Sequence, residues 1–345
     1  MKTIPQRVDL PFVPALEGLR AVAAMGVMVT HVAFQTGGTV AILERLDFMV
    51  AVFFALSAFL LWRRRGRHSA REYYLHRFRR VMPAYWACAA AVLLLLPGAG
   101  FTAAQVVANL TATQIFVPNG LAQGLTHLWS LCVEFSFYLA LPLLARVKKH
   151  RVAWIAAAGV ASLGWAWVAQ LVDVAGVNAQ IWPPAFTLWF AVGMLAAEYE
   201  GRVRAPRLVW PFWLLALACL WLASREWFGP RGLVHPQPAE FVGRVVLGAV
   251  FAACLVVPYA LGARSLVLES RLMRLLGLWS YGIFLWHVAV LWVVFPVTGI
   301  PFFSGHFFPV LVATAAGTIP VAAASYYFVE VPAQQRLRQL RKRPR

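Results

Sequence analysis

Long, nearly uncharged stretches of apolar residues constrain this chain more than any other feature of its sequence. They run for about 17 to 22 residues, the length of helix that crosses a bilayer core of about 30 Å. Of the 345 residues, 61% are hydrophobic and only 13% are charged, whereas a globular protein carries about 25% charged residues. We therefore expect an all-α polytopic integral membrane protein, a bundle of about ten transmembrane helices. They are placed at roughly 17–36, 47–62, 82–97, 128–145, 152–172, 182–198, 208–223, 242–261, 276–296 and 307–329.

These spans use up nearly the whole sequence, so residues 1–345 are expected to form a single transmembrane domain without an appended soluble domain. With ten spans both termini lie on the same side, and the connections on that side carry 26 of the 31 Lys and Arg residues. By the positive-inside rule both termini, including the basic tail 336–345, are predicted to be cytoplasmic in a multi-pass protein of the cell membrane. Topology and contact with anionic membrane lipids explain the net charge of +18, and we expect no nucleic-acid partner.

Several common functional motifs are absent from the sequence. The four cysteines all lie within predicted spans and form no CxxC pair, which argues against a disulfide framework and a zinc site. There is no HExxH motif and no Cys/His cluster, so we expect no metal cofactor. A Walker A loop, a G-x-G-x-x-G fingerprint and a G-x-S-x-G elbow are also missing.

The first predicted span contains an arginine and a histidine, and ionisable residues inside a membrane are costly enough to be functional candidates. Arg20 lies about one turn from the inner end of the helix, whereas His31 lies too deep to reach either surface. They are 11 residues apart, which places them on one helix face about 16 Å apart along the axis. The small residues Ala24 and Val27 lie between them. We expect this face to form a narrow, mostly apolar lane from the cytoplasmic side to His31.

A second deep ionisable group, Glu134, lies in the fourth predicted span at nearly the same depth as His31. A carboxylate at that depth could orient the imidazole ring and raise its basicity, so we predict that these two residues form an acid/base pair. Ser130, Glu134 and Tyr138 follow one another at intervals of four residues and should form one polar stripe. His127 stands at the outer end of this stripe.

His287 lies in the middle of the ninth predicted span, as either a second functional imidazole or a packing histidine. From the residues alone, the deep ionisable groups fit an enzyme, a proton-coupled transporter or flippase of a lipid-linked or small-molecule substrate, or a non-catalytic scaffold. The lack of an internal repeat counts against the transporter. The number of deep ionisable groups counts against the scaffold.

Five stretches of the sequence, taken in order, resemble the membrane acyltransferase-3 family: PALEGLRAVAAMGVMVTHV, FFALSAFLLWRR, LHRFRRVMPAYW, LTHLWSLCVEFSFYLALPLL and WSYGIFLWHVAVLWV. The resemblance covers almost the whole chain and includes the ten-span core. Its most specific element is an arginine and a histidine separated by ten residues in the first helix, which falls on Arg20 and His31. It implies an O-acyltransferase that moves an acyl group, often acetyl, from cytoplasmic acyl-CoA to an extracytoplasmic hydroxyl.

The resemblance also implies roles for individual residues. His31 matches the essential histidine, Arg20 the paired arginine and Glu134 the acidic residue of the HLWSLxVE segment. The basic R-x-R-R stretch matches Arg77, Arg79 and Arg80. This chain departs from the family at Phe135, where many members have a second acidic residue. Some members also carry a C-terminal soluble domain that completes the transfer. No such domain is expected here, so this chain is expected to deliver the acyl group itself or to a separate protein.

Both lines of reasoning lead to one expected mechanism. The phosphates of acyl-CoA, with acetyl-CoA as the expected donor, would bind the basic stretch and Arg20, and the thioester would reach His31. His31 would act as a general base or as a transient acyl carrier. The acceptor, a sugar or glycolipid on the far side of the membrane, is expected to contact four polar side chains: His127, Ser130, Tyr138 and His287.

Overall fold

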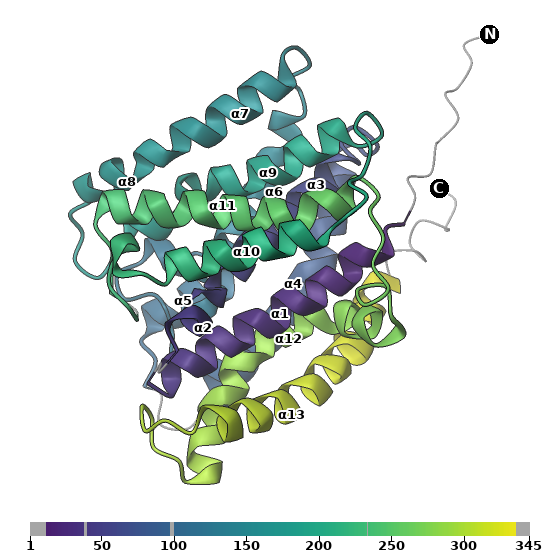
Figure 1. Cartoon of the computed structure of the whole chain (residues 1–345). Helices are drawn as coiled ribbons and strands as arrows, with labels where there is room; N and C mark the ends of the chain where they lie inside the picture. The colour runs from purple at the N-terminus through teal and green to yellow at the C-terminus, as the bar shows by residue number, and fades with distance from the viewer. Residues whose placement is uncertain (1–11, 38–39, 97–99, 233, 336–345) are drawn as a thin grey trace.

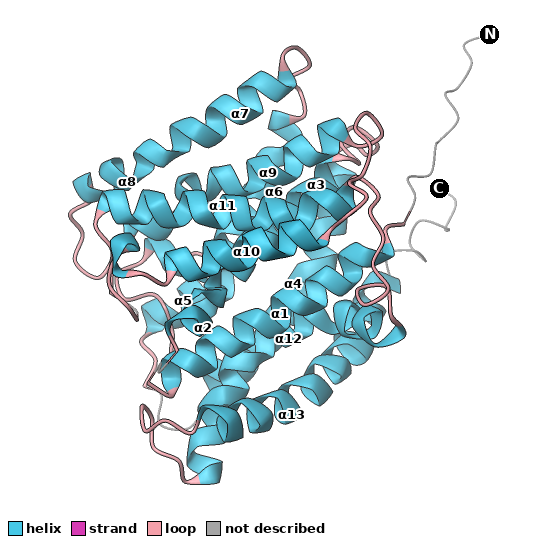
Figure 2. Ribbon diagram, viewed as in Figure 1, coloured by secondary structure: helices cyan, strands magenta, loops and turns pink. Residues whose placement is uncertain are grey.

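The computed structural model of the protein describes residues 12–37, 40–96, 100–232 and 234–335, so the predicted basic tail lies outside the described residues. Within these ranges the chain forms helices and loops and contains no strand (Figures 1 and 2). The long helices run roughly alongside one another in a single bundle (Figure 1). Their bounds are α1 Pro14–Gln35, α2 Ala41–Glu44, α3 Met49–Trp62, α4 Ala70–Leu95, α5 Ala103–Thr111, α6 Trp129–Leu144, α7 Arg151–Ala161, α8 Trp165–Val168, α9 Thr187–Tyr199, α10 Trp210–Ala223, α11 Pro238–Ala260, α12 Arg271–Thr298 and α13 Phe307–Ser325.

Eight helical stretches in the described part of the chain are long and apolar enough to cross a membrane. They are Pro14–Gln35, Ala41–Trp62, Ala70–Leu95, Thr126–Leu144, Arg151–Leu171, Pro238–Ala260, Arg271–Thr298 and Phe307–Gln335. The other two predicted spans correspond to α9 and α10, which have only 13 and 14 residues. The polytopic helical fold is therefore confirmed, and two of its expected spans are helices shorter than the rest.

Glycine residues allow the helices that carry the site to approach closely. Gly277 of α12 faces the backbone of α1, and a Cβ atom there would lie 2.1 Å from the carbonyl oxygen of Glu17. Gly193 of α9 meets α3 in the same way, 2.0 Å from the carbonyl oxygen of Ala55. Because lipid provides little hydrophobic force between helices, such close backbone contacts are a main source of helix association in membranes. They bring α1 against α12 and α3 against α9.

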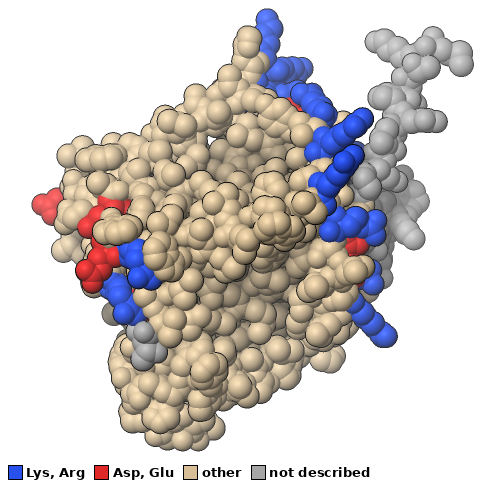
Figure 3. Space-filling model, in the orientation of Figure 1, with Lys and Arg blue, Asp and Glu red and all other residues tan. Residues whose placement is uncertain are grey.

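Basic side chains gather at one end of the bundle, beside the start of α1, whereas acidic and basic side chains lie together at the opposite end (Figure 3). We call the first the basic end; its described residues include Arg63–Arg65, Lys148, Lys149, Arg202, Arg204, Arg264 and Arg271. We call the opposite one the far end; it holds Glu44, Arg45, Asp47, Arg231 and Arg244. This separation agrees with the predicted alternation of the connections. Which end faces the cytoplasm remains a prediction from the positive-inside rule.

Candidate functional site

Three histidines from separate parts of the chain meet inside the bundle. His31 lies on α1, His127 in the 3-10 turn Thr126–Leu128, and His287 on α12. The ring centroid of His287 is 5.0 Å from that of His31 and 4.7 Å from that of His127. The centroids of His31 and His127 are 5.9 Å apart. His127 and His287 are 2% and 0% exposed, while His31 is partly exposed. We call these residues the histidine cluster.

The hydrogen bonds of the cluster fix which ring nitrogens carry a proton. The Nδ1 atom of His287 lies 2.8 Å from the carbonyl oxygen of Phe284, and that of His31 lies 2.8 Å from the carbonyl oxygen of Val27. A carbonyl oxygen only accepts hydrogen bonds, so both Nδ1 atoms must be donors. The Nε2 atom of neutral His287 is then an acceptor, and it lies 3.3 Å from Nδ1 of His31. The N–H of His31 is thus shared between Val27 and His287.

The second ring nitrogen of His31 is available for chemistry. With Nδ1 protonated, Nε2 of the neutral ring carries the lone pair. It makes no hydrogen bond with any described residue and is not enclosed by protein atoms. His31 also lines a cavity that opens toward the far end. An imidazole with one nitrogen anchored and the other facing a cavity has the arrangement required of a general base.

His127 and His287 occupy different positions from those predicted. They are buried and line none of the three cavities described below, so direct contact with an acceptor, as expected from the sequence, does not agree with this structure. Nε2 of His127 lies 3.2 Å from the carbonyl oxygen of Leu285 and ties its turn to α12. Its Nδ1 is buried without a hydrogen-bond partner. Both rings pack against that of His31.

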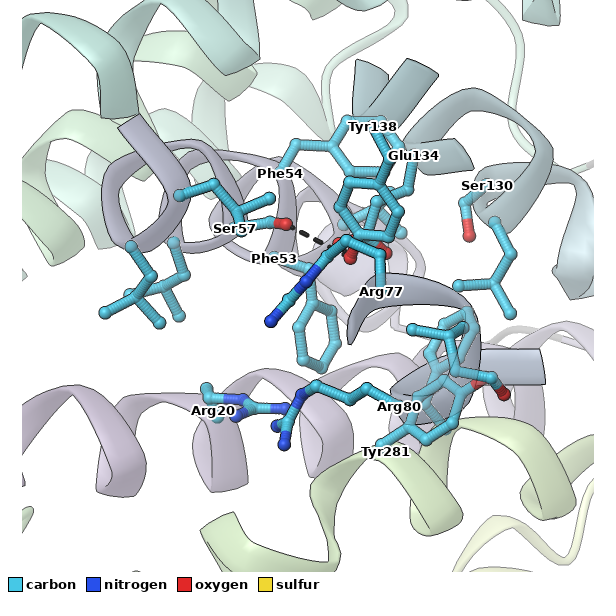
Figure 4. Close-up of a pocket in the computed structure, with 17 residues that line it drawn as sticks. Arg20, Phe53, Phe54, Ser57, Arg77, Arg80, Ser130, Glu134, Tyr138 and Tyr281 are labelled. Carbon is cyan, nitrogen blue, oxygen red and sulfur yellow. Dashed lines mark hydrogen bonds between the residues drawn. The ribbon is translucent and has the colours of Figure 1, made fainter. Parts of the chain in front are cut away.

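Glu134 is also bonded differently from the prediction. Its carboxylate accepts a hydrogen bond of 2.6 Å from the hydroxyl of Tyr138, one turn along α6. The Ser57 hydroxyl donates to Tyr138 over 3.3 Å (Figure 4). The expected hydrogen bond between Glu134 and His31 is absent from the described part of the structure, because α12 lies next to α1 and supplies His287 instead. Ser57 is therefore a member of this chain of hydroxyls.

A cavity of about 110 Å³ lies between α1, α3, α4, α6 and α12, and we call it the central cavity. The predicted stripe of Ser130, Glu134 and Tyr138 lines it. Arg20 and Arg80 also line it, and Figure 4 shows their guanidinium groups pointing toward one another. The remaining polar lining residues are Ser57, Arg77 and Tyr281.

Two of the three arginines of the central cavity lack an acceptor among the described residues. Arg77 and Arg80 make no hydrogen bond or ion pair with the described residues; Arg77 lies over the ring of Tyr138, 6.0 Å from its centroid. Arg20, in contrast, forms an ion pair with Glu17, at 3.8 Å. Guanidinium N–H groups without acceptors suit phosphate oxygens, which they bind in pairs. Arg79, the third arginine of the predicted stretch, lines none of the three cavities.

Two further cavities adjoin the central one. The basic vestibule, of about 460 Å³, opens at the basic end and shares Arg20 and Arg80 with the central cavity. Its other charged lining residues are Glu17, Arg271, Arg274 and Glu330. The far chamber, of about 250 Å³, is lined by His31 and shares Val50 with the central cavity. The three cavities therefore follow one another from the basic end to the far end.

This sequence of cavities replaces the lane predicted along α1. Ala24 is fully buried and packs in a cluster with Ile283 and Ala322, because the small residues of that face admit α12 and α13 instead of leaving a channel. The cavities run past Val50 and Phe53 of α3. Arg20 lines the central cavity and the basic vestibule, and His31 lines the far chamber; Val50 of α3 lines both the central cavity and the far chamber.

Comparisons with known proteins place the chain in a family. The chain belongs to the acyltransferase-3 family: its residues 13–328 match the family described as an acyltransferase domain. It is 30% identical to the acyltransferase MdmB of Streptomyces mycarofaciens, over 81% of this chain and 79% of that protein. It is 28% identical to nodulation protein 10 of Rhizobium leguminosarum, over 83% of this chain and 82% of that protein.

A third relative, the peptidoglycan O-acetyltransferase OatA of Listeria monocytogenes, is 23% identical over 94% of this chain. This chain covers only 56% of the length of that protein. No solved structure matches the chain.

Proposed function

We propose that this protein transfers an acyl group, most simply acetyl, from acyl-CoA at the basic end to a hydroxyl of a sugar, glycolipid or related acceptor at the far end. One observation carries the proposal: His31, whose Nε2 makes no hydrogen bond with the described residues, lines a chamber at the far end, and the neighbouring central cavity is lined by Arg77 and Arg80, which have no acceptor among those residues. An anionic donor and a neutral acceptor can therefore approach the same imidazole from opposite sides. The positive-inside rule makes the basic end cytoplasmic, where acyl-CoA is found.

The far chamber has the lining expected of a sugar site. Asp47, Asn178 and Gln180 supply carboxylate and amide groups for hydroxyls, and Trp129 and Phe241 supply aromatic faces. Ligand sites commonly combine such apolar walls with a few polar groups that fix orientation. The relatives named by their activity are acyltransferases, one of which acts on peptidoglycan. This favours acyl transfer over the transporter or flippase that the residues alone left open.

In the proposed reaction, Nε2 of His31 accepts the proton of the acceptor hydroxyl while the hydroxyl oxygen bonds to the thioester carbonyl carbon. The carbon–sulfur bond then breaks, and the CoA thiolate takes the proton from Nε2. The shared Nδ1–H of His31 stabilises the transient imidazolium through Val27 and His287. His31 as a transient acyl carrier is the other form of the same proposal.

Two measurements test this function. Purified protein in lipid nanodiscs should release CoA from acetyl-CoA, detected by thiol titration, and release should accelerate when cell-envelope extract supplies an acceptor. Mass spectrometry of surface glycans and glycolipids should show acetyl groups that disappear from cells lacking the protein. A purified protein that neither binds nor cleaves acetyl-CoA, together with unchanged surface acetylation, would refute the proposal.

His287 is expected to position His31 without touching the acceptor. His287→Leu removes the acceptor that holds Nδ1–H, and we expect kcat to fall about 10- to 100-fold with little change in KM, because one hydrogen bond to a charged group contributes about 1.5–3 kcal/mol. His287→Gln, whose carbonyl oxygen can replace Nε2, should restore part of the loss. Steady-state kinetics of both variants provide the comparison, and equal losses in kcat for the two would contradict a positioning role.

A further inference from the structure

The basic vestibule contains two arginines that neither the resemblance nor the predicted mechanism involves. Arg271 and Arg274 stand three residues apart in the first turn of α12, so they lie on one helix face. Together with Arg20 and Arg80 they place four arginines against two glutamates, Glu17 and Glu330, around a space of about 460 Å³. This volume falls within the range of about 300–1,000 Å³ typical of small-molecule sites.

The position of these two arginines is unfavourable for the helix itself. The N-terminus of a helix carries partial positive charge, so cations in its first turn are destabilising. The first turn of α12 contains no acidic residue, and Arg271 and Arg274 form no hydrogen bond with the described residues. The positive-inside rule explains basic residues at this end of the bundle, but not why these two share a cavity with Arg20 and Arg80. An anionic ligand would explain their placement.

Glu330 provides a second and independent indication of a ligand. It is 3% exposed and lines the vestibule, and its Oε1 atom is buried without a hydrogen-bond partner among the described residues. A buried carboxylate oxygen without a donor is costly, and binding an N–H or O–H group would relieve that cost. The ligand should therefore combine phosphate groups for the arginines with an amino or hydroxyl group for Glu330.

We propose that the basic vestibule binds the phosphorylated nucleotide part of the acyl-CoA donor, with Arg271 and Arg274 on its phosphates and Glu330 on its base or ribose. This rests on the proposed function and adds to it a site for the half of the donor that does not react. The pantetheine arm passes between Arg20 and Arg80 into the central cavity. The headgroup of an anionic lipid offers the same phosphate chemistry. The vestibule shares Arg20 and Arg80 with the central cavity. This position favours the donor, because the donor must extend from the vestibule toward His31, whereas a lipid headgroup stays at the rim of the bundle.

The test is binding of CoA, of adenosine 3′,5′-bisphosphate and of pantetheine to the full-length protein in nanodiscs of neutral lipid, measured by calorimetry. The variant is Arg271→Gln/Arg274→Gln. The matched control is Arg264→Gln, which removes a charge at the same end from a side chain that is 82% exposed and lines none of the three cavities. We expect the double variant to bind CoA and the bisphosphate at least about tenfold more weakly. Its affinity for pantetheine should change less than about twofold, and the control should behave as wild type.

The other possible binding results distinguish failure of the proposed donor from failure of the vestibule proposal. Wild-type protein that binds none of the three probes would contradict the proposed donor, whatever the arginines do. Wild-type protein that binds CoA, with a double variant that binds it equally well, would overturn the vestibule proposal alone. If 30% phosphatidylglycerol in the nanodisc abolishes the difference between wild type and double variant while both still bind CoA, the arginines hold a lipid headgroup instead, and the proposal fails.

Discussion

Replacing His31 by alanine is expected to abolish acyl transfer, with kcat lowered by about 10²- to 10⁴-fold, the usual contribution of a general base. The variant loses the nitrogen that receives the acceptor proton, while the cavities that hold the donor keep their lining. The fold should be little affected, because Nδ1 of His31 bonds a carbonyl of its own helix, that of Val27. We expect the free energy of unfolding to change by about 1 kcal/mol, as for a typical hydrogen bond.

The measurement is the rate of CoA release from acetyl-CoA in the presence of acceptor, alongside CoA affinity and thermal unfolding. His68→Ala, an exposed histidine at the basic end that lines none of the three cavities, is the matched control and should retain wild-type rates. Full activity of His31→Ala would exclude His31 from the chemistry. Radiolabelled acetyl-CoA without acceptor separates the two roles of His31, because only an acyl carrier would leave label on the wild-type protein that the variant lacks.

Replacing Arg80 by glutamine is expected to weaken acyl-CoA binding about 10- to 100-fold, since hydrogen bonds to a charged group contribute about 1.5–3 kcal/mol and about 1.4 kcal/mol corresponds to a factor of ten. Arg80 lines both the central cavity and the basic vestibule and has no acceptor of its own among the described residues. KM for the donor should rise while kcat changes less, because the residue binds the donor away from the reacting bond.

The same variant should not destabilise the empty protein. The guanidinium groups of Arg20 and Arg80 point toward one another (Figure 4), and like charges repel. Without donor, removing one of them should leave the melting temperature unchanged or raise it. Added CoA should raise the melting temperature of wild type more than that of the variant. Arg71→Gln, an exposed arginine on the same helix that lines none of the three cavities, is the control for charge loss. A lower melting temperature with unchanged CoA affinity would assign Arg80 a structural role instead.

The sequence by itself determined the class of fold, the family, the separation of charge between the two ends of the bundle, and the residues that share a helix face. These are local properties, since hydropathy over about 20 residues marks a span and 100° per residue fixes which side chains point together. The stripe of Ser130, Glu134 and Tyr138 was predictable for this reason. So was the depth of His31 and of Arg20.

Only the tertiary structure decided which faces of different helices meet. His31 contacts His287, 256 residues away, and Glu134 bonds within its own helix to Tyr138. Matched depth along two helices had suggested a pair between His31 and Glu134, but depth says nothing about how each helix is rotated or which neighbour it has. Close backbone contact at Gly277 sets that arrangement for α1 and α12. The same packing fills the face between Arg20 and His31 and moves the connecting cavities to α3.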